Sequence, residues 1–305
     1  MMIGQYTLYR WVLYFYIYCF LGWVFESCYV SLMNRKWVNR GFLHGPFLPI
    51  YGSGAVMMLF VSAPFKDNLI LTYFAGLAGA TLLELVTGML MEALFKVRYW
   101  DYSKQKFNFK GYICLSSSIA WGFFTIIMNE LIHPCIEKVL TYVPKIWEDS
   151  MMTIVTVLLV SDICLSVRDA LNLRNILVGM ENVRREVIIL RKRADVVIAV
   201  LDQEWKEYLK THPAAERIEE VGKELEERFT HVKNMFADAN RLSKEQREVF
   251  LEMKEKFSRL KSSSLRIKNR GTGNVHKMIK GNPSMTSSKY GHSLSSLKMY
   301  LKDQK

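Results

Sequence analysis

Five long apolar stretches alternate with polar loops in the first part of the chain. Their lengths approach or exceed the ~20 residues that a helix needs to cross a lipid bilayer. In order, they cover roughly residues 9–33, 47–63, 69–95, 112–132 and 151–171. We therefore expect an all-α, polytopic membrane helix bundle of about five spans. The second span is short and flanked by prolines, which predicts that it is tilted or re-entrant.

Beyond residue 172 the pattern changes to that of charged helices. Apolar residues between Leu173 and Leu201 recur at alternating spacings of three and four, which is typical of a heptad seam. This predicts a helix that continues the fifth span without a break. The seam would either form a homodimeric coiled coil through 173–201 or pack against later helices of its own chain. His212-Pro213 should interrupt the helix, with further helical segments following up to residue 262.

The last part of the chain is strongly basic. The whole chain has 41 Lys and Arg residues against 29 Asp and Glu residues, and few of the acids lie beyond residue 262. A segment rich in Ser, Gly and Lys buries too little apolar area to fold alone, so we expect 263–305 to be a disordered tail. Beside a membrane, such a tail is attracted to anionic lipid, and we do not expect nucleic acid as a partner. The expected domains are thus a membrane domain over 1–172, a cytoplasmic helical region over 173–262 and the tail.

The distribution of positive charge predicts the orientation. Lys and Arg follow the first and third spans, whereas the opposite loops carry mixed charge. Because cytoplasmic loops carry an excess of Lys and Arg, we expect a plasma-membrane protein with its N-terminus outside and its C-terminus in the cytoplasm. The basic residues concerned are Arg35, Lys36, Arg40, Lys96, Arg98, Lys104, Lys106 and Lys110.

Three carboxylates, Glu26, Glu84 and Glu92, lie inside the apolar stretches. Ionised groups are costly at membrane depth, so such residues normally face a bundle interior or a watery cavity. Each either binds a cationic or amphipathic cargo, or protons, or else pairs with Arg40, Arg98 or backbone donors and stabilises the bundle. Both interpretations remain open from the sequence.

The spacing along the third span places two of these acids together. Glu84 and Glu92 are two helical turns apart, about 12 Å at 1.5 Å per residue, and share one face with Gly88. We expect Gly88 to let a neighbouring helix approach closely.

A loop rich in glycine and proline joins the first two spans, over 39–54. Irregular backbone at membrane depth is tolerated only where protein or water satisfies it, which favours a re-entrant or broken entry to the second span. Specific motifs lie in this loop and on both sides of it. They are Phe20-Leu21-Gly22-Trp23 with Glu26, Asn39-Arg40-Gly41-Phe42-Leu43, Gly45-Pro46, Pro49-Ile50-Tyr51-Gly52, Glu84, Thr87, Leu90 to Phe95 around Glu92, Trp100-Asp101-Tyr102-Ser103, Phe107-Asn108, Ile113-Cys114-Leu115, Trp121-Gly122 and His133-Pro134.

In this order, the motifs resemble those of the putative ABC-transporter type IV membrane proteins, also called CmpB-like. The resemblance covers residue 20 to about residue 134. Two positions depart from the family pattern: Tyr99 stands where a second Trp is usual, and Tyr112 where Arg is usual. The resemblance implies a permease subunit of an ABC-type transporter.

The chain carries no Walker A sequence, so ATP would be handled by a separate nucleotide-binding subunit. The five cysteines form no CxxC pair and have no metal-ligand spacing, and we expect neither a metal nor a cofactor. We rank a transporter permease with a cytoplasm-facing polar cavity first, and a membrane scaffold or signalling protein acting through its cytoplasmic helices second. An intramembrane enzyme ranks third, because His44 and Asp101 offer a base and an acid but no motif marks a nucleophile. The candidate substrate-binding residues are Glu26, Asn39, Arg40, His44, Tyr51, Glu84, Glu92, Trp100 and Asp101.

Overall fold

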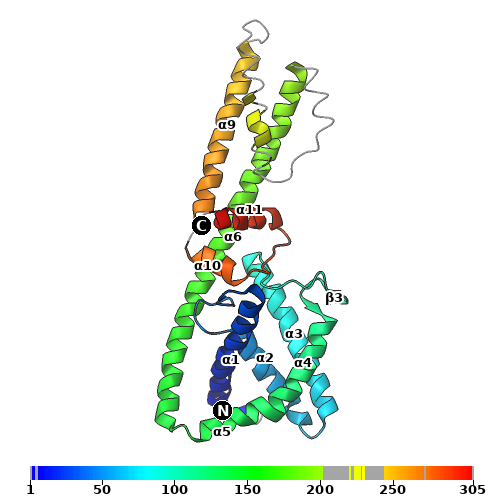
Figure 1. Ribbon diagram of the computed structural model, residues 1–305, viewed down its shortest axis with the longest axis vertical. Helices are drawn as coiled ribbons and strands as arrows, with labels where there is room; N and C mark the ends of the chain where they lie inside the picture. The colour runs from blue at the N-terminus through cyan, green and yellow to red at the C-terminus, as the bar shows by residue number, and fades with distance from the viewer. Residues whose placement is uncertain are drawn as a thin grey trace. The chain divides into compact units, whose positions relative to one another are not determined.

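The computed structural model describes residues 2–3, 6–201, 220, 223–227, 229–230, 244–270 and 273–303. These residues belong to two compact units. The first consists of Met1–Asn172 with Asn274–Ser288, and the second of Leu173–Gly273 with Lys289–Lys305. Helices make up most of both units (Figure 1), which confirms the predicted all-α fold.

The first unit is a bundle of helices in which two long loops, over 35–48 and 96–114, join the first helix to the second and the third to the fourth. Its first three helices are α1 (Leu8–Asn34), α2 (Pro49–Ser62), which ends in a 3₁₀ turn over Ala63–Phe65, and α3 (Leu69–Phe95). Then α4 (Leu115–Ile127), a π-helical turn (Met128–Ile132) and α5 (His133–Thr141) form one apolar rod, and α6 (Lys145–Leu201) begins in this unit. Two short antiparallel pairs complete it: β1 (Met2–Ile3) with β2 (Tyr6–Thr7), and β3 (Asn108–Phe109) with β4 (Ile113–Cys114).

Four of these helical rods are long and apolar enough to cross a membrane: Leu8–Asn34, Leu69–Phe95, Leu115–Thr141 and Lys145–Val196. The second predicted span is the exception. Helix α2 has 14 residues, about 21 Å at 1.5 Å per residue, which is shorter than the ~30 Å hydrocarbon core. Its shortness was predicted, and Pro49 at its first position explains where it begins.

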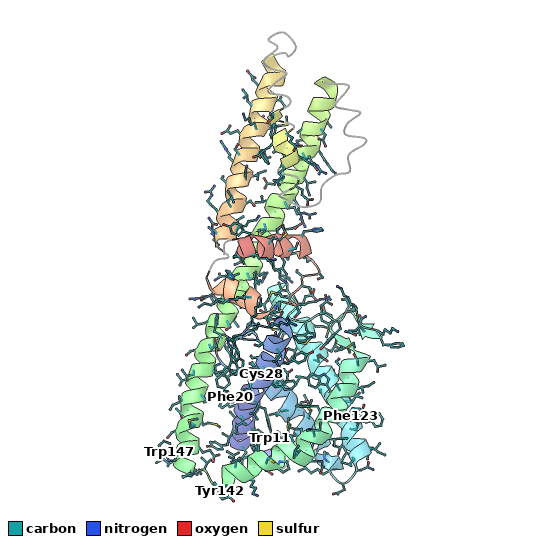
Figure 2. All side chains as sticks on the ribbon, viewed as in Figure 1. Trp11, Phe20, Cys28, Phe123, Tyr142 and Trp147 are labelled. Atoms are coloured by element: carbon teal, nitrogen blue, oxygen red, sulfur yellow. The ribbon has the colours of Figure 1, made fainter. Side chains whose placement is uncertain are left out.

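Large apolar side chains cover the outside of the bundle, as expected where lipid is the solvent. In Figure 2, Phe20 on α1 and Phe123 on α4 are exposed, whereas Trp11 is buried. Tyr142 and Trp147 are exposed at the turn between α5 and α6. Aromatic residues of this kind favour the membrane–water interface.

Small residues let the first helices pack closely. A Cβ atom at Gly22 of α1 would lie 2.3 Å from Cβ of Tyr51, and one at Gly52 of α2 would lie 2.4 Å from Sγ of Cys19. Helices α1 and α2 therefore touch almost backbone to backbone, as small residues allow in membrane bundles. This contact fixes Tyr51 beside α1.

One end of the bundle, here called the loop end, is where α1 and α3 finish and where α2 and α4 begin. Helix α1 stops at Arg35 and α3 stops at Lys96, both with left-handed backbone (φ 50° and 61°). A left-handed residue is a common helix terminator because it lets backbone N–H groups bond back to the last turn. The motif-bearing loops leave from these two caps.

The C-terminal segment differs from the predicted disordered tail. Residues 274–281 form helix α10 (Asn274–Gly281) in the first unit, and 291–303 form helix α11 (Gly291–Asp303) in the second. In α10, Val275, Met278 and Ile279 are buried. The composition argument failed because it averaged over the segment, whereas a few apolar residues at helical spacing are enough to dock a short helix.

In the second unit, α6 continues unbroken to Leu201, as predicted. Its seam packs against its own chain, which is one of the two expected alternatives. Val183, Val187 and Leu190 share an apolar core with residues of α9 (Lys244–Asn269), among them Met253 and Phe257. The predicted interruption at His212-Pro213 lies outside the described residues.

Candidate functional site

A cavity of about 290 Å³ lies inside the first unit, between α1, α2, α3 and α4. Two of the three intramembrane carboxylates, Glu26 and Glu84, line it, together with Arg40. The rest of the wall is largely apolar and rich in aromatic rings, namely Phe42, Tyr51, Tyr99, Trp100, Tyr102, Trp121 and Phe124. A mostly apolar cavity with a few convergent polar groups is the usual form of a small-molecule site.

Glu84 is the most deeply buried of the three acids, with 6% of its surface exposed. Tyr102 donates a hydrogen bond to its Oε1 (2.9 Å), while Trp121 Nε1 and the Ser117 hydroxyl donate to its Oε2 (3.0 and 3.3 Å). All three donors are neutral, and in the part of the chain that the structure describes no Lys, Arg or His forms an ion pair with Glu84. Among the described residues, the Glu84 carboxyl group is therefore hydrogen-bonded by neutral groups alone.

Tyr102 follows α3 in the loop and belongs to the motif Trp100-Asp101-Tyr102-Ser103. Burial and the neighbouring Glu84 carboxylate raise the pKa of its phenol. The hydroxyl thus keeps its proton and remains a donor to Glu84.

Glu26 has a charged partner. Arg40 Nε lies 3.3 Å from its Oε1, and the Tyr51 hydroxyl donates to its Oε2 at 2.6 Å. Arg40 comes from the glycine-rich loop and Tyr51 from the first turn of α2, so this loop and the helix that follows it supply the two partners. The predicted pairing of an acid with Arg40 is found here, and the pair faces the cavity.

Glu92 does not line the cavity. Arg98 Nε and the Tyr112 hydroxyl each donate to its Oε2 at 2.6 Å, and the Ser288 hydroxyl bonds to its Oε1. Burial acts to lower the pKa of Arg98, but the charge and hydrogen bond of Glu92 outweigh it and raise that pKa. Tyr112 therefore helps Arg98 to satisfy this acid.

Gly88 does allow a close approach, but not by a helix as predicted. A Cβ atom there would lie 3.1 Å from the Tyr112 ring and 3.3 Å from the Trp100 ring. Trp100 Nε1 in turn donates to the Tyr112 carbonyl (2.9 Å). The loop after α3 folds back onto α3 at this glycine, and in doing so it brings Trp100 to the cavity wall.

Three further predicted residues lie off the cavity, in structural networks. The backbone N–H groups of His44 and Gly45 donate to Asp162 of α6 (3.1 and 2.8 Å), and His44 Nδ1 lies 2.9 Å from the Ser166 hydroxyl. Asn39 accepts from Trp23 Nε1 (2.6 Å). These contacts join the loop to α6 and α1.

Asp101 is the third. Ser103 donates to its Oδ1 through both its backbone N–H and its hydroxyl, and Thr286 donates to its Oδ2 (3.0 Å). Burial acts to raise the pKa of Asp101, but these hydrogen bonds and nearby Arg98 lower it. Among the described residues, no contact joins Asp101 to His44, whose ring lies near Asp162.

Of the nine predicted site residues, the structure thus brings together five at the cavity: Glu26, Arg40, Tyr51, Glu84 and Trp100. Sequence reasoning did not identify Tyr102, Ser117 and Trp121 as the donors to Glu84, and it missed the cavity residue Asn282. Tyr102 and Trp121 do belong to the motifs given above. Their phenol and indole groups could have been proposed as hydrogen-bond donors to a membrane-buried acid. Nothing in the sequence linked Asn282 to the bundle, since it lies almost two hundred residues beyond Glu84. Among the described residues, no group of three or more His, Cys, Asp or Glu could hold a metal ion.

Comparison with known families finds one family model that matches the chain, described as "Putative ABC-transporter type IV", over residues 13–167. The match covers the bundle and both acids of the cavity. No solved structure matches the chain.

Proposed function

Because the chain belongs to the putative ABC-transporter type IV family, we propose that its membrane unit is a permease that binds an amphipathic organic cation in the cavity between Glu26 and Glu84. A separate nucleotide-binding subunit would supply the energy. The loop end would face the cytoplasm, in agreement with the positive charge of its loops.

The lack of a charged partner for Glu84 among the described residues is the observation that carries this proposal. Glu26 and Arg40 offset one another, so an ionised Glu84 leaves the cavity with one net negative charge. A buried charge normally requires a partner, because desolvation without one is costly. A monovalent cation would supply the missing partner.

The aromatic wall supports an organic cation over a small metal ion. Trp, Tyr and Phe rings attract cations through their faces, and they also offer apolar surface to a hydrocarbon body. Four of the rings meet at this cavity from three parts of the fold: Tyr51 from α2, Trp100 and Tyr102 from the loop after α3, and Trp121 from α4. Hydrated metal ions would instead need several convergent oxygen ligands.

The proposal is tested by binding of tetraphenylphosphonium, an amphipathic monovalent cation, to the purified protein in lipid nanodiscs. Glu84→Gln preserves the shape and part of the hydrogen bonding but removes the charge. We expect the Kd to rise at least about tenfold, which corresponds to about 1.4 kcal/mol.

Glu130→Gln is the matched control, because Glu130 is an exposed acid in the π-helical turn and does not line the cavity. It should leave the Kd unchanged. If Glu84→Gln folds and binds the cation as tightly as the unaltered protein, Glu84 is a structural residue and the proposed site is wrong.

A further inference from the structure

A segment distant in sequence lies against the loop end of the bundle. Residues 282–288, here called the strap, follow α10 and belong to the same compact unit as α1 to α5. The strap lies outside the region that the family model matches. Its contacts, however, are with residues of the family motifs and their neighbours.

The centre of the strap pairs with the chain after α3 as a short antiparallel bridge. Arg98 N–H donates to the Thr286 carbonyl (2.8 Å), and Thr286 N–H donates to the Arg98 carbonyl (3.0 Å). Hydroxyl groups add to this pairing. Thr286 donates to Asp101 (3.0 Å), Ser287 to the Lys96 carbonyl (2.5 Å) and Ser288 to Glu92.

The beginning of the strap reaches the cavity. Asn282 is 1% exposed and is one of the residues that line the cavity. Its Nδ2 donates to the Gly41 carbonyl (2.9 Å), and its Oδ1 accepts from Arg40 Nη1 (3.0 Å). Arg40 is the same residue that pairs with Glu26. The strap and the cavity acid therefore share one guanidinium.

We propose that the loop end is a binding surface for an extended, hydroxyl-rich peptide segment, and that the strap occupies it to close the cavity at that end. The backbone bridge recognises an extended chain by adding it to a backbone edge. Small hydroxyl side chains fit because each one reaches a carbonyl or a carboxylate of the loops. Larger side chains would displace these short contacts.

The contacts make the strap releasable. Most are hydrogen bonds, worth about 0.5–1.5 kcal/mol each in net terms, and Pro283, Ser284 and Ser288 remain exposed. Met285, 1% exposed, is the buried apolar side chain of the strap, whereas Val275, Met278 and Ile279 belong to α10, which precedes it. The strap can thus detach while α10 stays docked. Arg40 would then be free of Asn282 and remain beside Glu26.

Access to the cavity can be measured without any knowledge of the cargo. Thr87 lines the cavity, and Thr87→Cys provides a thiol there once the exposed Cys28, Cys135 and Cys164 are replaced by serine. The rate of its reaction with a membrane-impermeant maleimide, in nanodiscs that leave both faces open, reports whether the cavity is closed. This readout is independent of transport and of Glu84.

Thr286→Pro removes the N–H that donates to Arg98, so the bridge cannot form. We expect the labelling rate to rise at least tenfold. Gly291→Pro is the matched control, because Gly291 is the first residue of α11 and a Cβ atom there meets nothing within 4 Å. It should leave the rate unchanged.

A synthetic peptide of residues 282–290, which lacks α10 because that helix stays docked, should return the labelling of the Thr286→Pro protein to its original rate. The same peptide carrying proline at 286 should not. An unchanged rate in Thr286→Pro, or a raised rate that the peptide does not lower, would overturn the proposal. Asn282→Ala with Ser284→Ala gives a second test that leaves the backbone unaltered, and it too should raise the rate.

Discussion

The Tyr112 hydroxyl and the Arg98 guanidinium share one oxygen of Glu92, and the guanidinium also lies 4.7 Å from the centre of the Tyr112 ring. A hydrogen bond to a charged group contributes about 1.5–3 kcal/mol. Tyr112→Phe keeps the ring but loses this bond, so the variant should unfold at a lower temperature. Thermal unfolding in detergent, followed by size-exclusion chromatography, measures the difference.

Tyr142→Phe serves as the control for that experiment. Tyr142 is 77% exposed, and its only described hydrogen bond is made by its backbone N–H. Removal of the Tyr142 hydroxyl should therefore leave the unfolding temperature unchanged. Equal unfolding temperatures for Tyr112→Phe and Tyr142→Phe would show that Arg98 alone satisfies Glu92.

The sequence predicted that the three acids face inward, but not how they differ. Depth and helical face follow from position along an apolar stretch. Arg40 and Arg98 were named as possible partners, and both are found to pair with an acid. Which acid each one meets does not follow from the sequence, because these residues come from loops whose path depends on caps and glycines such as Lys96 and Gly88. Glu84 receives neutral donors and Glu92 a charged one, although both lie on one face of α3. The folded path of the loop after α3 determines which acid receives the charged donor.

Helix α2 depends on glycine at its contact with α1. A Cβ atom at Gly52 would lie 2.6 Å from the Phe15 carbonyl oxygen, which is backbone and cannot rotate away. Overpacking of this kind typically costs 1–3 kcal/mol. Gly52→Ala should therefore lower the unfolding temperature and displace Tyr51, which would weaken cation binding as well.

Gly54→Ala is the contrasting change in the same helix. A Cβ atom at Gly54 meets nothing within 4 Å. Alanine is favoured over glycine in a helix by about 0.5–1 kcal/mol, so this variant should be slightly more stable than the unaltered protein. A loss of stability equal to that of Gly52→Ala would mean that helix α2 does not pack on α1 as described.

Among the elements, the long helices were the easiest to predict, because an apolar run of that length is typical of a membrane-spanning helix. The continuation of α6 into the seam was predicted from spacing in the same way. Helices α10 and α11 were missed. In each helix, a few apolar residues such as Met278 or Leu297 make the buried contacts. Their basic neighbours lower the mean hydropathy of the segment, so an average over it does not reveal them. Short helices of this kind are evident only once their docking surface is known.

At the scale of the whole molecule, the two ends of the membrane unit carry different charge. The loop end has Arg35, Lys36 and the lysines around β3, several of them unopposed by a nearby acid in sequence. At the other end, basic and acidic groups offset each other: Arg10 pairs with Glu148 (3.1 Å), and Lys66 stands beside Asp67 in the sequence. The asymmetry predicts that the loop end faces the cytoplasm.

Single-cysteine proteins test this orientation in intact cells. Cys135 is exposed on α5, at the end opposite the loop end, and should react with a membrane-impermeant maleimide added outside. Ser103→Cys, in the loop after α3, should react only after the cells are permeabilised, because that loop would lie in the cytoplasm. The reverse pattern would place the cavity's strap outside the cell, where no nucleotide-binding subunit could reach the loop end. A permease driven by cytoplasmic ATP would then be ruled out, whatever the cavity binds.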